Sequence, residues 1–405
     1  MKLTISRPAL KLFAIKYLWL LILLPKMVQF AVYVILLCLL LLKRPIKLNR
    51  GVFFIILGAL VQVVSILWQC ITKDPSLSRI AAGLNTSLIW IVSALYYSLF
   101  LEEDDPLLNK FHNYFCINLL IMFGIYLFSL VSSASTFNVL GHTLYLRRMD
   151  YLSSGTTSRF AGLTETVLGP SHFYAFTLPI LLIGKDDWKG ALLAILGFIC
   201  VFETHSRMGV ICCGGMLLVF LRRILIKRFG IKKIRPFDTF FIITAIVVLI
   251  LNFNTFTSAF IRFFNARGGS NEARFTIYRK SLEAFWNENP LIGCGIKNMI
   301  DMGNGYSFPY GSHSMYIGFL YKTGVIGTVF YLLGFIEIFM GMVRGLKNNP
   351  NRTSIILIFL CYFVMLIFAD LDASDWVIVT MFSVWGILSN KREIDLYAKE
   401  KYASS

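Results

Sequence analysis

The sequence has few charged residues, and acidic residues are the scarcer kind, 22 against 39 basic ones. Charged residues make up 15% of the 405 residues and hydrophobic residues 57%, with a mean hydropathy of +0.69. Because soluble globular domains carry about 25% charged residues, this composition excludes a soluble protein. No CxxC pair or other metal-ligand spacing occurs, and most of the 8 cysteines lie inside apolar runs as small buried residues. We therefore expect neither a metal ion nor another cofactor.

Long apolar runs recur along the whole chain, and most are long enough to cross roughly 30 Å of hydrocarbon as a helix. The sequence therefore predicts an all-α polytopic membrane protein of about twelve spans, with residues 1–405 forming a single membrane domain. The first run lacks a small-residue cleavage site, so we expect it to be retained and not removed as a signal peptide. The predicted spans are 8–25, 27–42, 51–71, 79–101, 111–131, 170–184, 187–204, 207–221, 237–254, 313–343, 354–370 and 375–390.

The predicted span 313–343 is longer than one crossing requires. Lys322, Gly324 and Gly327 interrupt its apolar sequence. We therefore expect a separate helical segment, tilted or interfacial, ahead of the true span.

The excess of basic residues is interpreted as a topological signal. These residues lie in short loops between apolar runs and not on one soluble module, so no nucleic acid partner is expected. The positive-inside rule then places both termini in the cytoplasm and the segments 132–169 and 255–312 outside. Because loops longer than about 15 residues are uncommon unless functional or disordered, we expect these segments to fold as a cap on the bundle.

Arginine is frequent on the predicted outside face, where the positive-inside rule should deplete it. A guanidinium keeps its charge and matches phosphate oxygens with two donors, so clustered arginines suit a diphosphate ligand. Nothing around Arg262 and Arg267 is specific, and we interpret these two as surface charges. The outside arginines are Arg147, Arg148, Arg159, Arg207, Arg262, Arg267, Arg274 and Arg279.

Arg207 lies in a very short hairpin between two apolar runs, close behind Glu203 and His205. An ionisable residue at this depth usually faces the bundle interior and serves binding or transport. Snorkelling of the Arg207 side chain to the interface is the alternative. Glu203 either pairs with Arg207 or takes part in catalysis.

The segment 271–285 has the pattern of an amphipathic helix. Arg274, Tyr278 and Ser281 share one face of it, because they are spaced at i, i+4 and i+7. One face can thus carry a charge to a lipid phosphate while another packs on the protein.

A turn, a histidine and a group of carboxylates follow this helix. Gly293-Cys294-Gly295 permits a sharp turn whose backbone amides can cradle an anion. His313 opens the next apolar run, and at a helix N-terminus the dipole favours the neutral imidazole, which can accept a proton. His313 is therefore a candidate general base, with a role in the helix cap as the alternative. Further along, Asp370, Asp372 and Asp375 either hold arginines or supply an alternative base.

Four motifs form an ordered set between residues 159 and 330. They are Arg159-Phe160-x-Gly162 with Gly169-Pro170-Ser171-His172, then Ser206-Arg207, then an Arg274-led helix running into Asn289-Pro290-x-x-Gly293-x-Gly295, and finally Ser312-His313-x-x-Tyr316 with Gly324-x-x-Gly327. Together they resemble the O-antigen ligase and O-antigen polymerase family of bacterial envelope glycosyltransferases. In the first motif, Ser171 stands where the family usually has asparagine.

The resemblance implies a metal-independent glycosyltransferase of the GT-C type in the cytoplasmic membrane of a bacterium. Its implied partners are a glycan donor on undecaprenyl diphosphate, a lipid-linked glycan acceptor, membrane lipids and a chain-length regulator. Arg207 and Arg274 are expected to neutralise the leaving diphosphate, while His313 orients or deprotonates the acceptor hydroxyl. The residues expected to bind the diphosphate or the substrate are Arg159, Arg279, Tyr278, Tyr316, Glu203 and His172.

Three functions remain compatible with these residues. The chain shows no large extra domain, which favours a polymerase that extends a lipid-linked repeat unit over a ligase that transfers the glycan to lipid A-core. A flippase for a lipid-linked oligosaccharide also places arginines near a diphosphate. Flippases more often contain internal repeats and charges along both halves of a central path, and neither pattern is found here.

Overall fold

The computed structural model describes residues 6–43, 46–101, 107–152, 155–184, 187–228, 270–302, 307–372 and 374–396. The predicted span 237–254, the first part of the outside segment 255–312, and Arg262 and Arg267 lie outside these residues.

Each predicted span within the described residues coincides with a helix or a pair of helices. In the part of the chain that the structure describes, six helices are long and apolar enough to cross a membrane, namely α3, α4, α5, α6, α9 and α13, and four more are apolar but shorter. The prediction of a multi-pass helical membrane protein is therefore confirmed. The helices are α1 (Arg7–Lys16), α2 (Leu18–Ile22), α3 (Lys26–Lys43), α4 (Arg50–Lys73), α5 (Leu77–Leu101), α6 (Leu108–Val131), α7 (Gly169–Ile183), α8 (Asp187–Phe202), α9 (Arg207–Arg228), α12 (Ser270–Glu288), α13 (Met315–Gly345), α14 (Arg352–Met365) and α15 (Asp375–Ser389).

Helices α4 and α13 pack closely because glycines face large side chains between them. A Cβ on Gly58 of α4 would lie 2.9 Å from the ring of Tyr331, and one on Gly334 of α13 would lie 2.6 Å from Ile55. Small residues let helix backbones approach within a membrane, where van der Waals packing replaces the hydrophobic effect as the driving force.

Helix α13 is broken at Gly324, where φ is +60° and ψ is −166°. The ring of Phe319, before the break, stacks on that of Tyr331, after it, with centroids 4.2 Å apart. In a straight helix these residues would be separated by about 18 Å along the axis. Helix α13 is therefore sharply bent at Gly324, and the predicted interruption of this element is confirmed.

The segment 290–295 fills the break in α13 and takes up the backbone groups that the break leaves without helical partners. Unpaired backbone groups are costly in a membrane interior, so such a break requires a partner segment. The NH groups of Cys294 and Gly295 donate to the carbonyls of Tyr321 and Lys322, at 2.7 and 2.9 Å, and those of Val325 and Ile326 donate to Pro290 and Leu291, at 2.9 and 3.1 Å. The prediction that amides of this turn cradle an anion is therefore wrong for Cys294 and Gly295, since both already bind α13.

Replacing Gly293 by alanine is expected to destabilise the protein far more than the same change at Gly141. Both glycines have positive φ, +75° and +79°, but a Cβ on Gly293 would lie 2.4 Å from the nitrogen of Gly324, whereas nothing lies within 4 Å at Gly141. We expect Gly141→Ala to cost about 1 kcal/mol for backbone strain and Gly293→Ala about 2–4 kcal/mol. Unfolding of the two variants in detergent measures the difference, and equal losses would contradict the docking of 290–295 in α13.

The segment 132–169, predicted to lie outside, contains a three-stranded antiparallel sheet in the order β1-β2-β3, formed by β1 (Thr136–Val139), β2 (His142–Leu152) and β3 (Gly155–Thr164). The all-α prediction is wrong for this part of the chain. Leu144 and Leu146 of β2 are fully buried, so β2 alternates with period two, a pattern that an analysis of long apolar runs does not detect. A short ladder of β4 (Met299–Asp301) and β5 (Ser307–Pro309) forms in the second segment.

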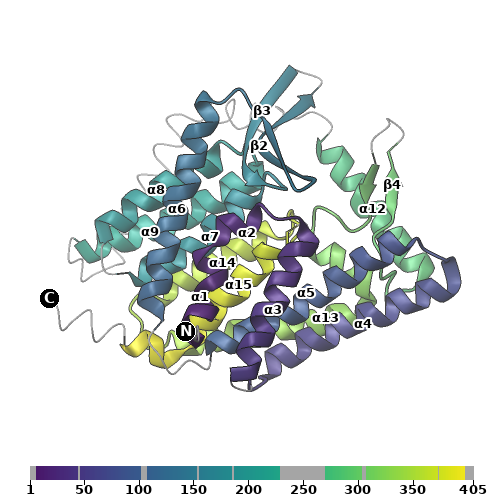
Figure 1. The fold of residues 1–405 in the computed structure, drawn as a ribbon, viewed down its shortest axis with the longest axis horizontal. Helices are drawn as coiled ribbons and strands as arrows, with labels where there is room; N and C mark the ends of the chain where they lie inside the picture. The colour runs from purple at the N-terminus through teal and green to yellow at the C-terminus, as the bar shows by residue number, and fades with distance from the viewer. Residues whose placement is uncertain are drawn as a thin grey trace, which may run out of the picture.

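Figure 1 shows the three-stranded sheet, α12 and β4 at one end of the helical bundle, drawn uppermost, while α1 begins near the opposite end. We call the end with these elements the capped end. The two long segments, which are far apart in the sequence, therefore cover the same end of the bundle.

Candidate functional site at the capped end

One face of α12 binds the segment that precedes α13. The hydroxyl of Tyr278 donates to the carbonyl of His313 at 2.7 Å, and the NH of Gly311 donates to the buried hydroxyl of Ser281 at 2.8 Å. Burial raises the pKa of Tyr278, which keeps its hydroxyl a donor. The predicted helix and the shared face of Tyr278 and Ser281 are confirmed.

His313 lies just before α13, with φ +64°, and is not the residue that caps it. The cap is Ser314, whose side chain accepts a hydrogen bond from the NH of Ile317. The NH of Met315 donates to the carbonyl of Leu366 at 3.1 Å, which attaches the start of α13 to the end of α14. The alternative prediction, that His313 forms the helix cap, is therefore wrong, because its neighbour Ser314 is the cap.

The surroundings of His313 keep its imidazole neutral. Burial, and after it the positive charge of Arg274, lowers the pKa of His313 from 6.5 to about 4. Asp370 acts in the opposite direction, while Lys297 and Arg148 lower the pKa as well. Four charged side chains, from α12, β2 and two connecting segments, thus act electrostatically on His313 at the capped end.

Acidification is expected to destabilise the protein between pH 6.5 and about pH 4 through His313. The unfolded chain binds a proton near pH 6.5, but the folded chain does so only near its pKa of about 4, so the unfolded state gains protons first as the pH falls. Above pH 6.5 both states are neutral and the effect vanishes. The effect is measured as the pH dependence of the free energy of unfolding of wild type and His313→Gln across this range. Identical pH slopes for the two proteins would contradict the burial of a neutral imidazole.

Arg159, Glu203 and Arg207 form a second group, where β3 meets the α8–α9 hairpin. The Nε of Arg159 donates to the carbonyl of Thr204 at 2.7 Å, and the NH of Phe160 donates to the carbonyl of Glu203 at 2.9 Å. Arg207 is the first residue of α9 and is only 8% exposed. This burial agrees with the expectation that Arg207 faces the bundle interior. The Glu203 carboxylate lies 3.6 Å from Arg147 of β2, a partner that the sequence did not indicate.

Three of the predicted binding residues have other surroundings. The Nδ1 atom of His172, buried in α7, lies 3.0 Å from the hydroxyl of Tyr362 in α14. The hydroxyl of Tyr316 donates to the carbonyl of Phe363 at 3.2 Å. The Arg279 side chain is 70% exposed and lies 3.8 Å from Glu283 one turn further along α12. The structure does not bring Arg279 or His172 to the face that binds the His313 segment.

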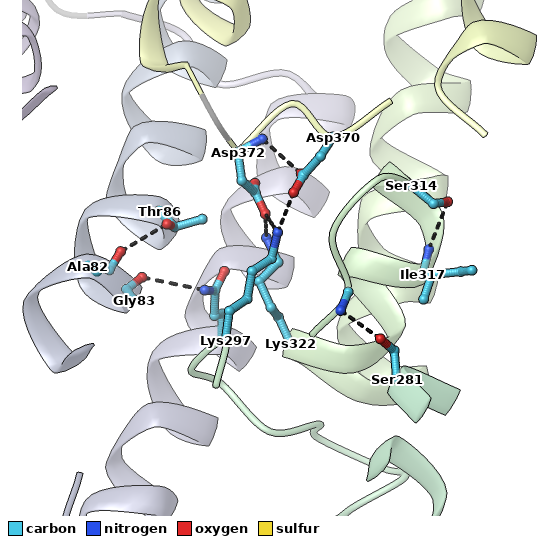
Figure 2. A network of polar contacts seen from close by, with 12 residues as sticks. Ala82, Gly83, Thr86, Ser281, Lys297, Ser314, Ile317, Lys322, Asp370 and Asp372 are labelled. Carbon is cyan, nitrogen blue, oxygen red and sulfur yellow. Dashed lines mark hydrogen bonds and ion pairs between the residues drawn. The ribbon is translucent and has the colours of Figure 1, made fainter. Parts of the chain in front are cut away.

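A largely buried network of two lysines and two aspartates lies beside His313, with Lys322 its most buried member, and the sequence analysis did not find its pairing. Lys297 Nζ lies 2.6 Å from Asp370 and 3.0 Å from Asp372, and Lys322 of α13 contacts the same Asp372 oxygen. Figure 2 shows both lysines pointing toward the two carboxylates, which lie on the turn between α14 and α15. These aspartates therefore hold lysines, and the interpretation that they hold arginines is corrected.

The network favours the ionised forms of Asp372 and Lys297. Burial alone would raise the pKa of Asp372, but Lys322 and Lys297 hold it well below its usual range. Burial likewise acts to lower the pKa of Lys297, yet Asp370 and Asp372 raise it. Lys322 carried a signal that could have revealed the network, because an ionisable residue inside an apolar helix nearly always has a partner. No pattern in the sequence indicates which residue that partner is.

The comparisons agree with the expected class. Residues 192–332 match the model of a family described as O-antigen ligase. The matched segment contains Arg207, Arg274 and His313, whereas Arg159 and both aspartates lie outside it. The fold is that of a multi-pass membrane protein, and over residues 192–332 the chain is similar to the O-antigen ligase family, as the motifs predicted. No curated protein matches the chain.

Proposed function

We propose that the chain is a polysaccharide polymerase of the GT-C type. It transfers a glycan from undecaprenyl diphosphate to a lipid-linked repeat unit on the outer face of a bacterial cytoplasmic membrane. The observation that carries the proposal is the position of His313, whose carbonyl accepts a hydrogen bond from Tyr278 and whose pKa is lowered by burial and by the charge of Arg274.

The proposed reaction needs one proton acceptor and positive charge at the leaving group. The acceptor hydroxyl oxygen forms a bond to the anomeric carbon, and the bond from that carbon to the diphosphate oxygen breaks. His313 takes the hydroxyl proton. Arg207 and Arg274, with Arg159, neutralise the charge that develops on the diphosphate, which leaves carrying the electron pair.

The proposed orientation puts the capped end outside and both termini in the cytoplasm. Basic residues gather at the far ends of several spans, including Arg222, Arg223, Lys227 and Arg228 in the last turns of α9. The start of α1 near the end opposite the cap agrees with this orientation (Figure 1). Positive residues favour the cytoplasmic side during insertion.

A ligase that transfers the glycan to lipid A-core is the second candidate, favoured by the description of the matched family model. The two functions leave different products when the gene is deleted. We expect single lipid-linked repeat units to accumulate if the protein is a polymerase. Accumulation of full-length, unligated lipid-linked chains would identify a ligase instead.

Replacing Arg207 by alanine is expected to reduce transfer by about 100-fold or more, since a buried charge at the leaving group acts at low dielectric. The rate of glycan transfer is measured with purified protein in liposomes that contain a lipid-linked donor and acceptor. Arg344→Ala is the matched control, because Arg344 is 69% exposed near the end of α13 and should leave turnover unchanged. If Arg207→Ala turns over like the control, Arg207 has no role at the diphosphate.

A further inference from the structure

Helix α12 has three different sides. Its buried side consists of Ile277, Ser281 and Phe285. A second side is apolar yet exposed, with Phe275 68%, Leu282 41% and Trp286 72% exposed. A third side carries the pair Arg279 and Glu283, whose side chains are 70% and 61% exposed. A helix at the surface of a soluble protein needs only two sides, one for the core and one for water.

The helical repeat places the two exposed sides next to each other around the axis of α12. At about 100° per residue, Phe275, Leu282 and Trp286 fall within an arc of about 40°, and Arg279 and Glu283 follow on one flank of it. The three apolar residues thus lie in one line along the helix and form an apolar stripe. The charged residues form its border, in the arrangement of a helix that lies in a membrane interface.

The apolar stripe continues into the exposed surface of α13. Leu291, three residues after the end of α12, is 62% exposed. Its carbonyl accepts the NH of Ile326, and the carbonyl of Pro290 accepts the NH of Val325. Val325 and Ile326 are exposed apolar residues of a helix long and apolar enough to cross the membrane. Leu291 therefore connects the stripe of α12 to a surface that faces lipid.

The end of α12 is also fixed beside the end of α4, another such helix. Glu288 of α12 and Lys73 of α4 form an ion pair at 2.7 Å. The last turns of α4 expose apolar residues too, namely Leu67, Trp68 and Ile71. Lys73 marks where the apolar sequence of α4 ends, so Trp286, two residues before Glu288, lies close to the level of the membrane boundary.

We propose that the Phe275, Leu282 and Trp286 stripe of α12 lies in the outer interface of the lipid bilayer. The stripe contacts the upper parts of the acyl chains, and Arg279 and Glu283 face the headgroups and water. The bilayer then fixes the rotation of α12 about its axis, and with it the direction of Tyr278 toward the His313 segment. This role of α12 does not depend on which glycan the protein transfers.

Quenching of Trp286 fluorescence tests the proposal. The full chain is reconstituted in phosphatidylcholine and phosphatidylglycerol vesicles, with and without lipids brominated near the headgroup end of the acyl chain. The emission of Trp286 is the difference between wild type and Trp286→Phe. The matched control is Glu283→Trp in the Trp286→Phe background, which puts a tryptophan on the charged side less than one turn away.

We expect brominated lipid to remove most of the Trp286 emission and aqueous iodide to remove little. For the tryptophan at position 283 we expect the reverse order of the two quenchers. Equal quenching of both positions by iodide would overturn the proposal, since α12 would then lie in water. Protection of Trp286 from both quenchers would also overturn it, and would point to a protein partner or a second copy on this side of α12.

Discussion

Replacing Asp372 by alanine is expected to lower the free energy of unfolding by about 3–5 kcal/mol, because it leaves a buried lysine charge uncompensated. Lys322 is 2% exposed and contacts the Asp372 carboxylate directly, and Lys297 lies 3.0 Å from the same oxygen. Unfolding of the purified protein in detergent micelles measures the loss. We expect transfer to fall with it, since the network joins the turn before α15 to the segments around His313.

A double variant separates the cost of an unpaired charge from the value of the pair itself. Lys322→Met with Asp372→Asn removes both ions, and we expect it to be clearly more stable than Asp372→Ala alone. The control is Glu337→Gln, which removes a partner of Arg344 at the protein surface, where the ion pair contributes about 0–1 kcal/mol. A double variant as unstable as Asp372→Ala, or an Asp372→Ala protein as stable as wild type, would contradict this account.

Replacing His313 by alanine is expected to slow transfer by about 100- to 10,000-fold, the usual contribution of a positioned general base. Folding should be nearly unchanged, because Ser314 caps α13 and Tyr278 binds the backbone carbonyl of His313, which alanine retains. Turnover of lipid-linked substrates by purified protein in liposomes measures the effect.

The matched control for this variant is His142→Ala. His142 also lies outside the predicted spans, in β2, and lies 3.5 Å from Glu165. We expect His142→Ala to retain most of the wild-type turnover. Comparable rates for the two alanine variants would show that His313 is not the proton acceptor. The carboxylates of the α14–α15 turn would then be the next candidates for the general base.

The helices could be predicted because hydropathy is a local property. The predicted span 51–71 corresponds to α4, and 111–131 lies within α6. Helix α9 runs to Arg228 whereas its predicted span ends at 221, because basic residues continue the helix after its apolar sequence has stopped. The strands were not predicted because their alternation with a period of two occurs outside the membrane-spanning runs. In those segments the mean hydropathy says little about secondary structure.

The candidate site could be predicted only as far as its residues share an element. Tyr278 and Ser281 follow from helical spacing, and His313 from its place at the start of an apolar run. The pairing of Lys322 with Asp372 joins residues 50 apart in the sequence. It depends on the sharp bend of α13 at Gly324, and on the attachment of that region to the segment 290–295. No periodicity within one helix contains this information.

The pairing of Lys322 also sets an order for assembly of the protein during synthesis. The segment 290–295, which fills the break in α13, precedes that helix in the chain, so its carbonyls and NH groups are present when α13 enters the membrane. Asp372 is made 50 residues after Lys322. The pairing of Lys322 with Asp372 can therefore form only after α14 has been made and the turn before α15 has emerged, which makes that turn the last part required to complete the network beside His313.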